Sequence, residues 1–152
     1  MMNHSLFGNL TDWGTVLEKL EKLSKTKELD AYQDELIRLL RFDGNWRLRE
    51  AAIEALPLVQ HPSLDLAGEV LSLVKRKDIY YDVRILAADC LDLLIQKIAD
   101  GKAYDRDMIR KFIQGALLDL DTLLNSPEPP KFSNILEKTR QNISEIKAAV
   151  YA

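Results

Sequence analysis

Two stretches of the chain are similar to each other: residues 43–56 (DGNWRLREAAIEAL) and residues 78–91 (DIYYDVRILAADCL). The second follows the first at an offset of 35 positions, and four aligned pairs keep their residue type: Asp43 with Asp78, Arg49 with Arg84, Ala52 with Ala87, and Leu56 with Leu91. A fixed period of roughly 20–50 residues is typical of stacked helical repeats, in which no unit buries its apolar face alone. This internal repeat therefore decides the fold.

The two copies resemble the HEAT repeat, in particular its short bacterial form, often called PBS-lyase-type. That pattern has an aspartate, a turn, often an aromatic residue, and then Val-Arg-x-x-Ala, and residues 46–56 and 81–88 follow it. The motifs of tetratricopeptide and ankyrin repeats, whose periods are similar, are absent. The resemblance implies an all-α, right-handed solenoid of about seven antiparallel helices, an α-α superhelix.

The resemblance also implies a structural cross-link in each copy. In HEAT repeats the aspartate of the turn and the arginine six residues later commonly form a ladder between neighbouring units. The implied ladder residues here are Asp43, Arg49, Asp78 and Arg84. An arginine in this place is expected to hydrogen-bond an aspartate and the carbonyls of the turn, so it stabilises the fold rather than binding a ligand.

Apolar residues recur at helical spacing along most of the chain, and no segment alternates as a half-buried strand does. The periodicity predicts seven helices: one capped by Thr11 or Asp12 and ending near Ser24, then 28–42, 45–60, 63–76, 79–99, 104–125 and 132–150. Trp13 is expected on the apolar stripe of the first helix. Gly44 is expected in a turn, as a glycine free to take positive φ, and Gly101 as a left-handed cap at the end of the fifth helix.

We expect one domain. Residues 1–10 are predicted to be an N-terminal arm, and residues 11–152 a single HEAT-like helical-repeat domain. Within it the best-matching repeats are 43–77 and 78–125, and the flanking segments 11–42 and 131–152 are caps. A short solenoid needs such degenerate ends to stay soluble.

Composition excludes several classes of protein. The 152 residues carry 21 basic and 24 acidic side chains and a net charge of −3, so no global positive field draws the chain to nucleic acid or to an anionic bilayer. No apolar run approaches the ~18 residues of a membrane span. The single cysteine, Cys90, cannot form an internal disulfide. These features predict a cytoplasmic protein with no membrane association.

The residues that could carry chemistry do not gather into a site. Cys90 lies on an apolar helix face, and His4 and His61 are far apart with no ligand cluster around them. Carboxylate pairs such as Asp89 with Asp92 are typical of a solvated helix face. We therefore expect no catalytic residue, no cofactor and no metal, and favour a protein that is not an enzyme.

The leading hypothesis is a non-enzymatic scaffold or adaptor that binds a protein partner along the helices at 63–76 and 104–125. Tyr80 aligns with Asn45 of the first copy, so it is the aromatic residue expected to act as an exposed anchor. The predicted partner-binding residues are Glu69, Ser72, Lys75, Tyr80, Arg110, Lys111 and Gln114.

Two alternatives stay open. Short HEAT repeats also build accessory bilin lyases or isomerases, so the resemblance admits that activity. Nucleic-acid binding through the basic helix ends at 75–77 and 106–111 is disfavoured by the net charge. The oligomeric state is not predicted.

Overall fold

The computed structural model describes residues 6–151. Residues 1–5 of the expected N-terminal arm, and Ala152, lie outside the described residues. The rest of the arm packs against the domain, because Phe7 and Leu10 are buried and the Phe7 N–H donates to the Glu35 carboxylate at 3.0 Å. The Lys19 ammonium also donates to the carbonyl of Leu6 at 3.0 Å.

Within residues 6–151 the chain is all helical, with no strand. The seven α-helices are α1 (Trp13–Thr26), α2 (Gln33–Arg41), α3 (Trp46–Ala55), α4 (Leu64–Lys75), α5 (Tyr81–Asp100), α6 (Arg106–Leu124) and α7 (Pro130–Tyr151). A 3₁₀ turn, η1 (Leu29–Tyr32), leads into α2, and another, η2 (Leu56–Leu58), follows α3. The helical class and the number of helices agree with the prediction.

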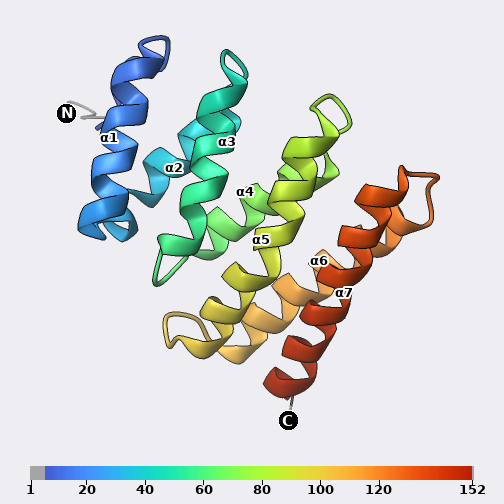
Figure 1. Ribbon diagram of the computed structural model, residues 1–152. Coiled ribbons are helices and arrows are strands. Elements are labelled where there is room, and N and C mark those ends of the chain that lie inside the picture. The colour runs from blue at the N-terminus through green and yellow to red at the C-terminus, as the bar shows by residue number, and fades with distance from the viewer. Residues whose placement is uncertain (1–5, 152) are drawn as a thin grey trace.

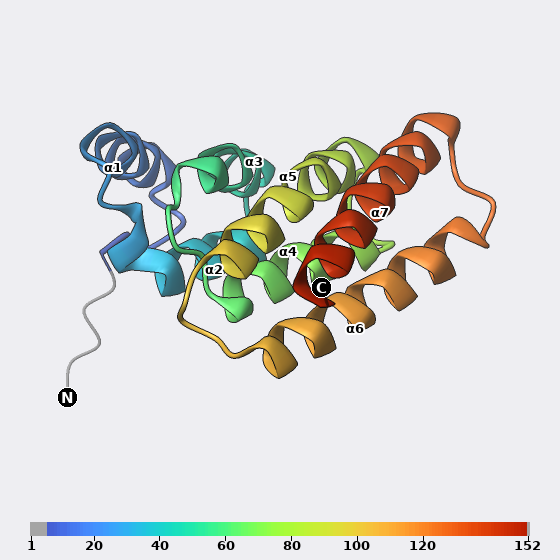
Figure 2. The same ribbon diagram turned by 90° about the horizontal axis from the view of Figure 1, so that it is seen from below.

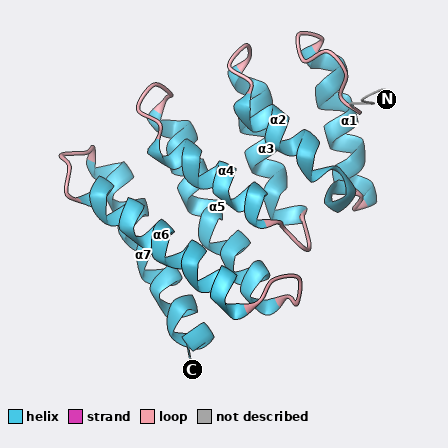
Figure 3. Ribbon diagram, turned by 180° about the vertical axis from the view of Figure 1, so that it is seen from behind, coloured by secondary structure: helices cyan, strands magenta, loops and turns pink. Residues whose placement is uncertain are grey.

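The helices lie in two layers (Figures 1 and 2). One layer contains α1, α3, α5 and α7, and the other contains α2, α4 and α6, which face the viewer in Figure 3. Neighbours contact one another within each layer, and α2 with α3, α4 with α5, and α6 with α7 contact across the layers. The loops at 42–45, 76–80 and 125–129 therefore lie along one edge of the molecule, at the top of Figure 1. We call this the turn edge.

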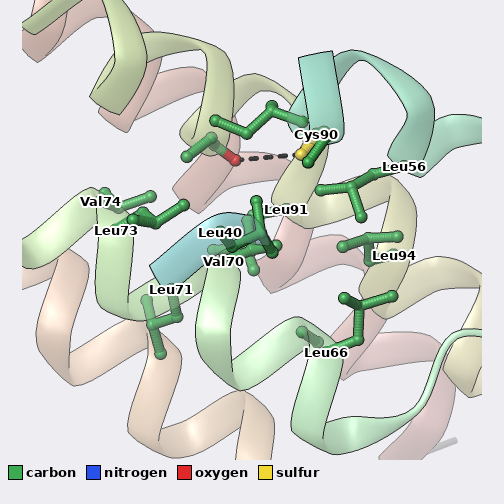
Figure 4. Packing of buried hydrophobic residues seen from close by; sticks show 14 of the residues in the cluster. Leu40, Leu56, Leu66, Val70, Leu71, Leu73, Val74, Cys90, Leu91 and Leu94 are labelled. Atoms are coloured by element: carbon green, nitrogen blue, oxygen red, sulfur yellow. Dashed lines mark hydrogen bonds between the residues drawn. The ribbon is translucent and has the colours of Figure 1, made fainter. Parts of the chain in front are cut away.

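The core is continuous between the layers, and α4 and α5 lie at its centre. Figure 4 shows Val70 and Leu66 of α4 facing Leu91 and Leu94 of α5, all buried. Both alanines of the repeat, Ala52 and Ala87, are fully buried, as a close approach between helices requires. The core joins both copies of the repeat to the flanking helices.

Side-chain caps fix where three helices begin. Asn45, Ser63 and Asp105 accept hydrogen bonds from the backbone N–H groups of the second or third residue that follows, at 2.8, 3.0 and 2.8 Å. Such bonds satisfy N–H groups that have no partner inside the helix. The positions of α3, α4 and α6 thus follow from local sequence.

Three local expectations were wrong. Gly101 has φ −83° and ψ −179°, and its N–H bonds to the carbonyls of Lys97 and Ile98, so it needs no left-handed conformation. The left-handed cap is instead Lys27, at φ 59°, after α1. Trp13 is 47% exposed because α1 is the outermost helix of its layer. Gly44 is not among the residues with positive φ; it leaves room for the ring of Phe42, which a Cβ at this position would meet.

Candidate functional site

A network of two arginines and two aspartates joins the first two loops of the turn edge. Buried Arg49 donates from Nε to the Leu40 carbonyl at 2.9 Å and from Nη2 to the carboxylate of Asp43. Arg76 Nη2 lies 3.2 Å from the same Asp43 oxygen and 2.6 Å from Asp78 Oδ2, while its Nε lies 2.9 Å from Asp78 Oδ1. Arg76 therefore holds the aspartates of both copies of the repeat.

The network stabilises the ionised form of both aspartates. The hydrogen bonds from Arg76 lower the pKa of Asp78 to about 2. The hydrogen bond from Arg49, with a smaller effect of Arg76, lowers the pKa of Asp43. Both carboxylates stay open to solvent, so at neutral pH this edge has two fixed negative charges facing two guanidinium groups.

Arg84 has a different environment from its counterpart Arg49. The side chain is 2% exposed, and its Nε donates to the Val74 carbonyl at 3.0 Å. The expected contact with Asp78 is not formed among the described residues; the guanidinium instead lies over the rings of Phe132, at 4.4 Å, and Tyr81, at 5.1 Å. The pairing differs because Arg76 occupies both oxygens of Asp78 and Phe132 of α7 covers Arg84. The face of an aromatic ring attracts a cation, which offsets part of the cost of burial.

A cleft of about 460 Å³ opens over this network on the turn edge. Trp46, the first residue of α3, and Tyr80, the residue before α5, are 53% and 75% exposed and form its outer part. The Tyr80 hydroxyl has no hydrogen-bond partner among residues 6–151. The full lining is Asp43, Gly44, Asn45, Trp46, Arg49, Arg76, Asp78, Ile79, Tyr80 and Val83. We call it the turn-edge cleft.

The other predicted partner-binding residues are spread over several surfaces. Glu69 accepts from Arg41 Nε at 2.8 Å in a groove between α2 and α4, and Lys75 forms an ion pair with Asp119 at 3.2 Å. Ser72 and Lys111 are exposed. These residues of α4 and α6 do not converge on one pocket.

Two residues of α6 contact the end of α7 instead. Gln114 donates to the Tyr151 hydroxyl at 2.9 Å, and the Arg110 guanidinium lies 4.7 Å from the centre of the Tyr151 ring. Arg110 also forms an ion pair with Asp107 at 3.6 Å. Of the seven predicted partner-binding residues, Tyr80 is the one that lines the turn-edge cleft.

Sequence reasoning missed the bridging role of Arg76. The repeat pattern drew attention to the arginine six residues after each aspartate, whereas Arg76 lies two residues before Asp78 at the end of α4. An arginine that follows the last turn of a helix and precedes the turn aspartate could have indicated the contact. The link across to Asp43 has no such sequence signal.

Cys90 has the properties of a core residue. Burial, with smaller contributions from Asp89 and Asp92, raises the pKa of the thiol to about 12, and the thiol donates to the Ala87 carbonyl at 3.4 Å. The described residues contain no group of three or more His, Cys, Asp or Glu side chains placed to hold a metal ion. In the same part of the chain, no helix has the length and apolar character of a membrane span.

Comparisons of the chain with protein-family models, with curated proteins and with solved structures found no significant match.

Proposed function

We propose that this protein is a non-enzymatic scaffold or adaptor of the HEAT-repeat type, and that it binds a protein partner at the turn-edge cleft. Three features support the repeat assignment: the two copies at an offset of 35 positions, the two layers of helices, and the Arg49–Asp43 contact in the turn of the first copy. In this proposal the layers are a short right-handed solenoid of antiparallel helices, and the protein acts in the cytoplasm.

The observation that carries the binding proposal is the pair of exposed aromatic side chains at the cleft. Tryptophan and tyrosine are enriched among the residues that contribute most to protein–protein affinity. Trp46 and Tyr80 come from consecutive copies of the repeat, and the Arg76 network that joins those copies also lines the cleft. The aromatic residues are thus held on a rigid base, which lowers the entropy cost of binding.

Cross-linking from the cleft tests the proposal. A photoreactive phenylalanine analogue would replace Tyr80 in one variant and Trp13 in another, because Trp13 is a similarly exposed aromatic residue on α1 that lies outside the cleft. After irradiation in cells of the source organism, we expect a discrete protein adduct from position 80 and none of the same mass from position 13. Identical adducts from both positions, or none from position 80, would exclude the cleft as the binding site.

A further inference from the structure

A second surface, separate from the turn-edge cleft, lies between the C-terminal halves of α5 and α7. Two hollows of about 350 and 180 Å³ adjoin there and share Gln96, Ile146 and Ala149 in their linings. The two helices lie side by side (Figures 1 and 2) and contact each other extensively. We call this surface the α5–α7 groove.

The groove has a mixed lining, in which Leu93 is the exposed large apolar side chain. Leu93 of α5 is 38% exposed, although its neighbours in sequence, Leu94 and Ile95, are buried in the core. The other apolar side chains in the lining are Ala99, Ile109, Ile146, Ala149 and Val150. An exposed leucine beside such residues offers area that a partner could bury.

Carboxylates lie among these apolar side chains in the lining. Asp92, Asp100 and Glu145 line the groove, and Arg106 is the single cation in the lining. Asp100 accepts a hydrogen bond from the neutral amide of Gln96 at 2.9 Å, and Asp92 accepts one from the amide of Asn142. These neutral amides do not neutralise the carboxylates, and the lining has three carboxylates to one cation.

Glu145 contributes an unpaired negative charge to the groove, since it has no hydrogen bond or ion pair within residues 6–151. One turn before Asp92, exposed Asp89 lies outside the lining and forms an ion pair with Lys138 at 3.7 Å. Since the whole chain has a net charge of only −3, this groove is more acidic than the average surface.

We propose that the α5–α7 groove binds a basic amphipathic helix of a partner protein. Apolar side chains of that helix would cover Leu93, Ile146 and Ala149, and its lysines or arginines would lie beside Asp92, Asp100 and Glu145. Charge complementarity selects this partner, because nucleic acid and anionic membranes would be repelled. From Asp92 to Asp100 the groove extends about 12 Å at ~1.5 Å per residue, which is the length of about two helical turns.

The test uses a fluorescently labelled synthetic peptide of 14 residues, with leucines on one helical face and lysines on the other. Two control peptides have the same composition in scrambled order, or glutamate in place of lysine. The protein variants are Asp92→Asn with Glu145→Gln, Leu93→Ser alone, and a matched control, Glu18→Gln with Glu137→Gln, which removes two exposed charges outside the groove. Circular dichroism melts establish that all variants are folded.

We expect the lysine–leucine peptide to bind the wild-type protein and both control peptides to bind far more weakly. Since each exposed ion pair contributes a few-fold at most, Asp92→Asn with Glu145→Gln should raise the Kd about fivefold, and Leu93→Ser should raise it also. The Glu18→Gln, Glu137→Gln variant should bind like the wild type. Amide NMR shifts on binding should map to residues 89–100 and 142–150.

Three results would overturn the proposal: no peptide binding, equal weakening by both double variants, or NMR shifts centred on Trp46 and Tyr80. A sedimentation experiment in which neutralising the groove dissociates a dimer would assign the surface to a second copy of this chain instead. Because the variants leave Trp46 and Tyr80 unchanged, a failure of the groove variants leaves the turn-edge cleft untested, whereas peptide shifts centred on Trp46 and Tyr80 would move the peptide site to that cleft.

Discussion

Arg76 and Asp43 are 33 positions apart in the chain, and their side chains meet at 3.2 Å on the turn edge. The same guanidinium holds Asp78, so one side chain contacts the turn aspartate of both copies of the repeat. The bond from Arg76 Nη2 to Asp78, two positions away, is shorter, at 2.6 Å. The relative position of the two loops that line the turn-edge cleft depends on this contact.

Replacing Arg76 should weaken the fold most clearly in acid. The folded-state pKa of Asp78 is lowered to about 2, below an unfolded value near 3.9, so the network stabilises the fold above about pH 4 and is lost as pH falls toward 2. Arg76→Gln should lower the melting temperature at pH 7 and flatten the change in stability between pH 4 and 2. Thermal melts over that range measure both effects. The control is Arg47→Gln, which replaces an exposed arginine and should give the wild-type dependence of melting temperature on pH. The same dependence in Arg76→Gln would contradict the account.

Arg84→Ala should destabilise the protein by about 2–4 kcal/mol, because it removes a buried side chain and leaves the Val74 carbonyl without its donor. Arg84→Met should lower the free energy of unfolding by less than Arg84→Ala does. The guanidinium has no carboxylate partner among the described residues and its Nη2 lacks a hydrogen bond, so an apolar side chain loses little electrostatic energy. Urea denaturation of both variants gives the comparison. Equal stability of Arg84→Ala and wild type would show that the packing on Phe132 is unimportant.

Gly44→Ala should destabilise the turn by about 1–2 kcal/mol, because its Cβ would meet the ring of Phe42. In a Phe42→Ala background the same change should cost almost nothing. A double-mutant cycle with urea denaturation measures this coupling. If Gly44→Ala were as costly without the ring as with it, the glycine would be required for a reason other than space.

Thr139→Val should cost about 1 kcal/mol, because the buried hydroxyl of Thr139 donates to the Ala88 carbonyl at 2.8 Å and joins α7 to α5. Thr122 offers a matched control. Its hydroxyl donates to the Leu118 carbonyl at 3.0 Å on an exposed surface of α6, where water replaces the bond. The free energy of unfolding of Thr122→Val should stay within about 0.5 kcal/mol of the wild-type value in the same denaturation experiment. Equal losses in both variants would refute a specific α5–α7 contact.

The helices could be predicted from sequence because their signals are local. The spacing of apolar residues gave seven helices in the right order, and residues such as Ser63 and Asp105 cap them through bonds within three positions. Gly101 and Gly44 were misinterpreted because a glycine after a helix or in a turn can have either of two roles. It can adopt a left-handed conformation, or it can leave room for a neighbouring group. The backbone angles and the position of Phe42 decide between these two roles.

The candidate site was less predictable because it depends on contacts between distant residues. The pairing of Arg49 with Asp43 spans six positions and followed from the repeat pattern, whereas Arg76 reaches Asp43 across 33 positions. Arg84 leaves the expected pattern because Phe132, from a helix outside both copies, lies over its guanidinium. Tyr80 was expected to be an exposed aromatic anchor, but the cleft that it shares with Trp46 depends on how the loops at 42–45 and 76–80 lie together.

The central claim, that the turn-edge cleft binds a protein, is tested most directly by the affinity of the cross-linked partner for three forms of the protein. Wild type, Trp46→Ala and Trp13→Ala would be compared by isothermal titration calorimetry, since both tryptophans are about half exposed and Trp46 alone of the two lines the cleft. We predict that Trp46→Ala raises the Kd about tenfold or more and that Trp13→Ala leaves it unchanged. Equal affinity of Trp46→Ala and wild type would contradict the account.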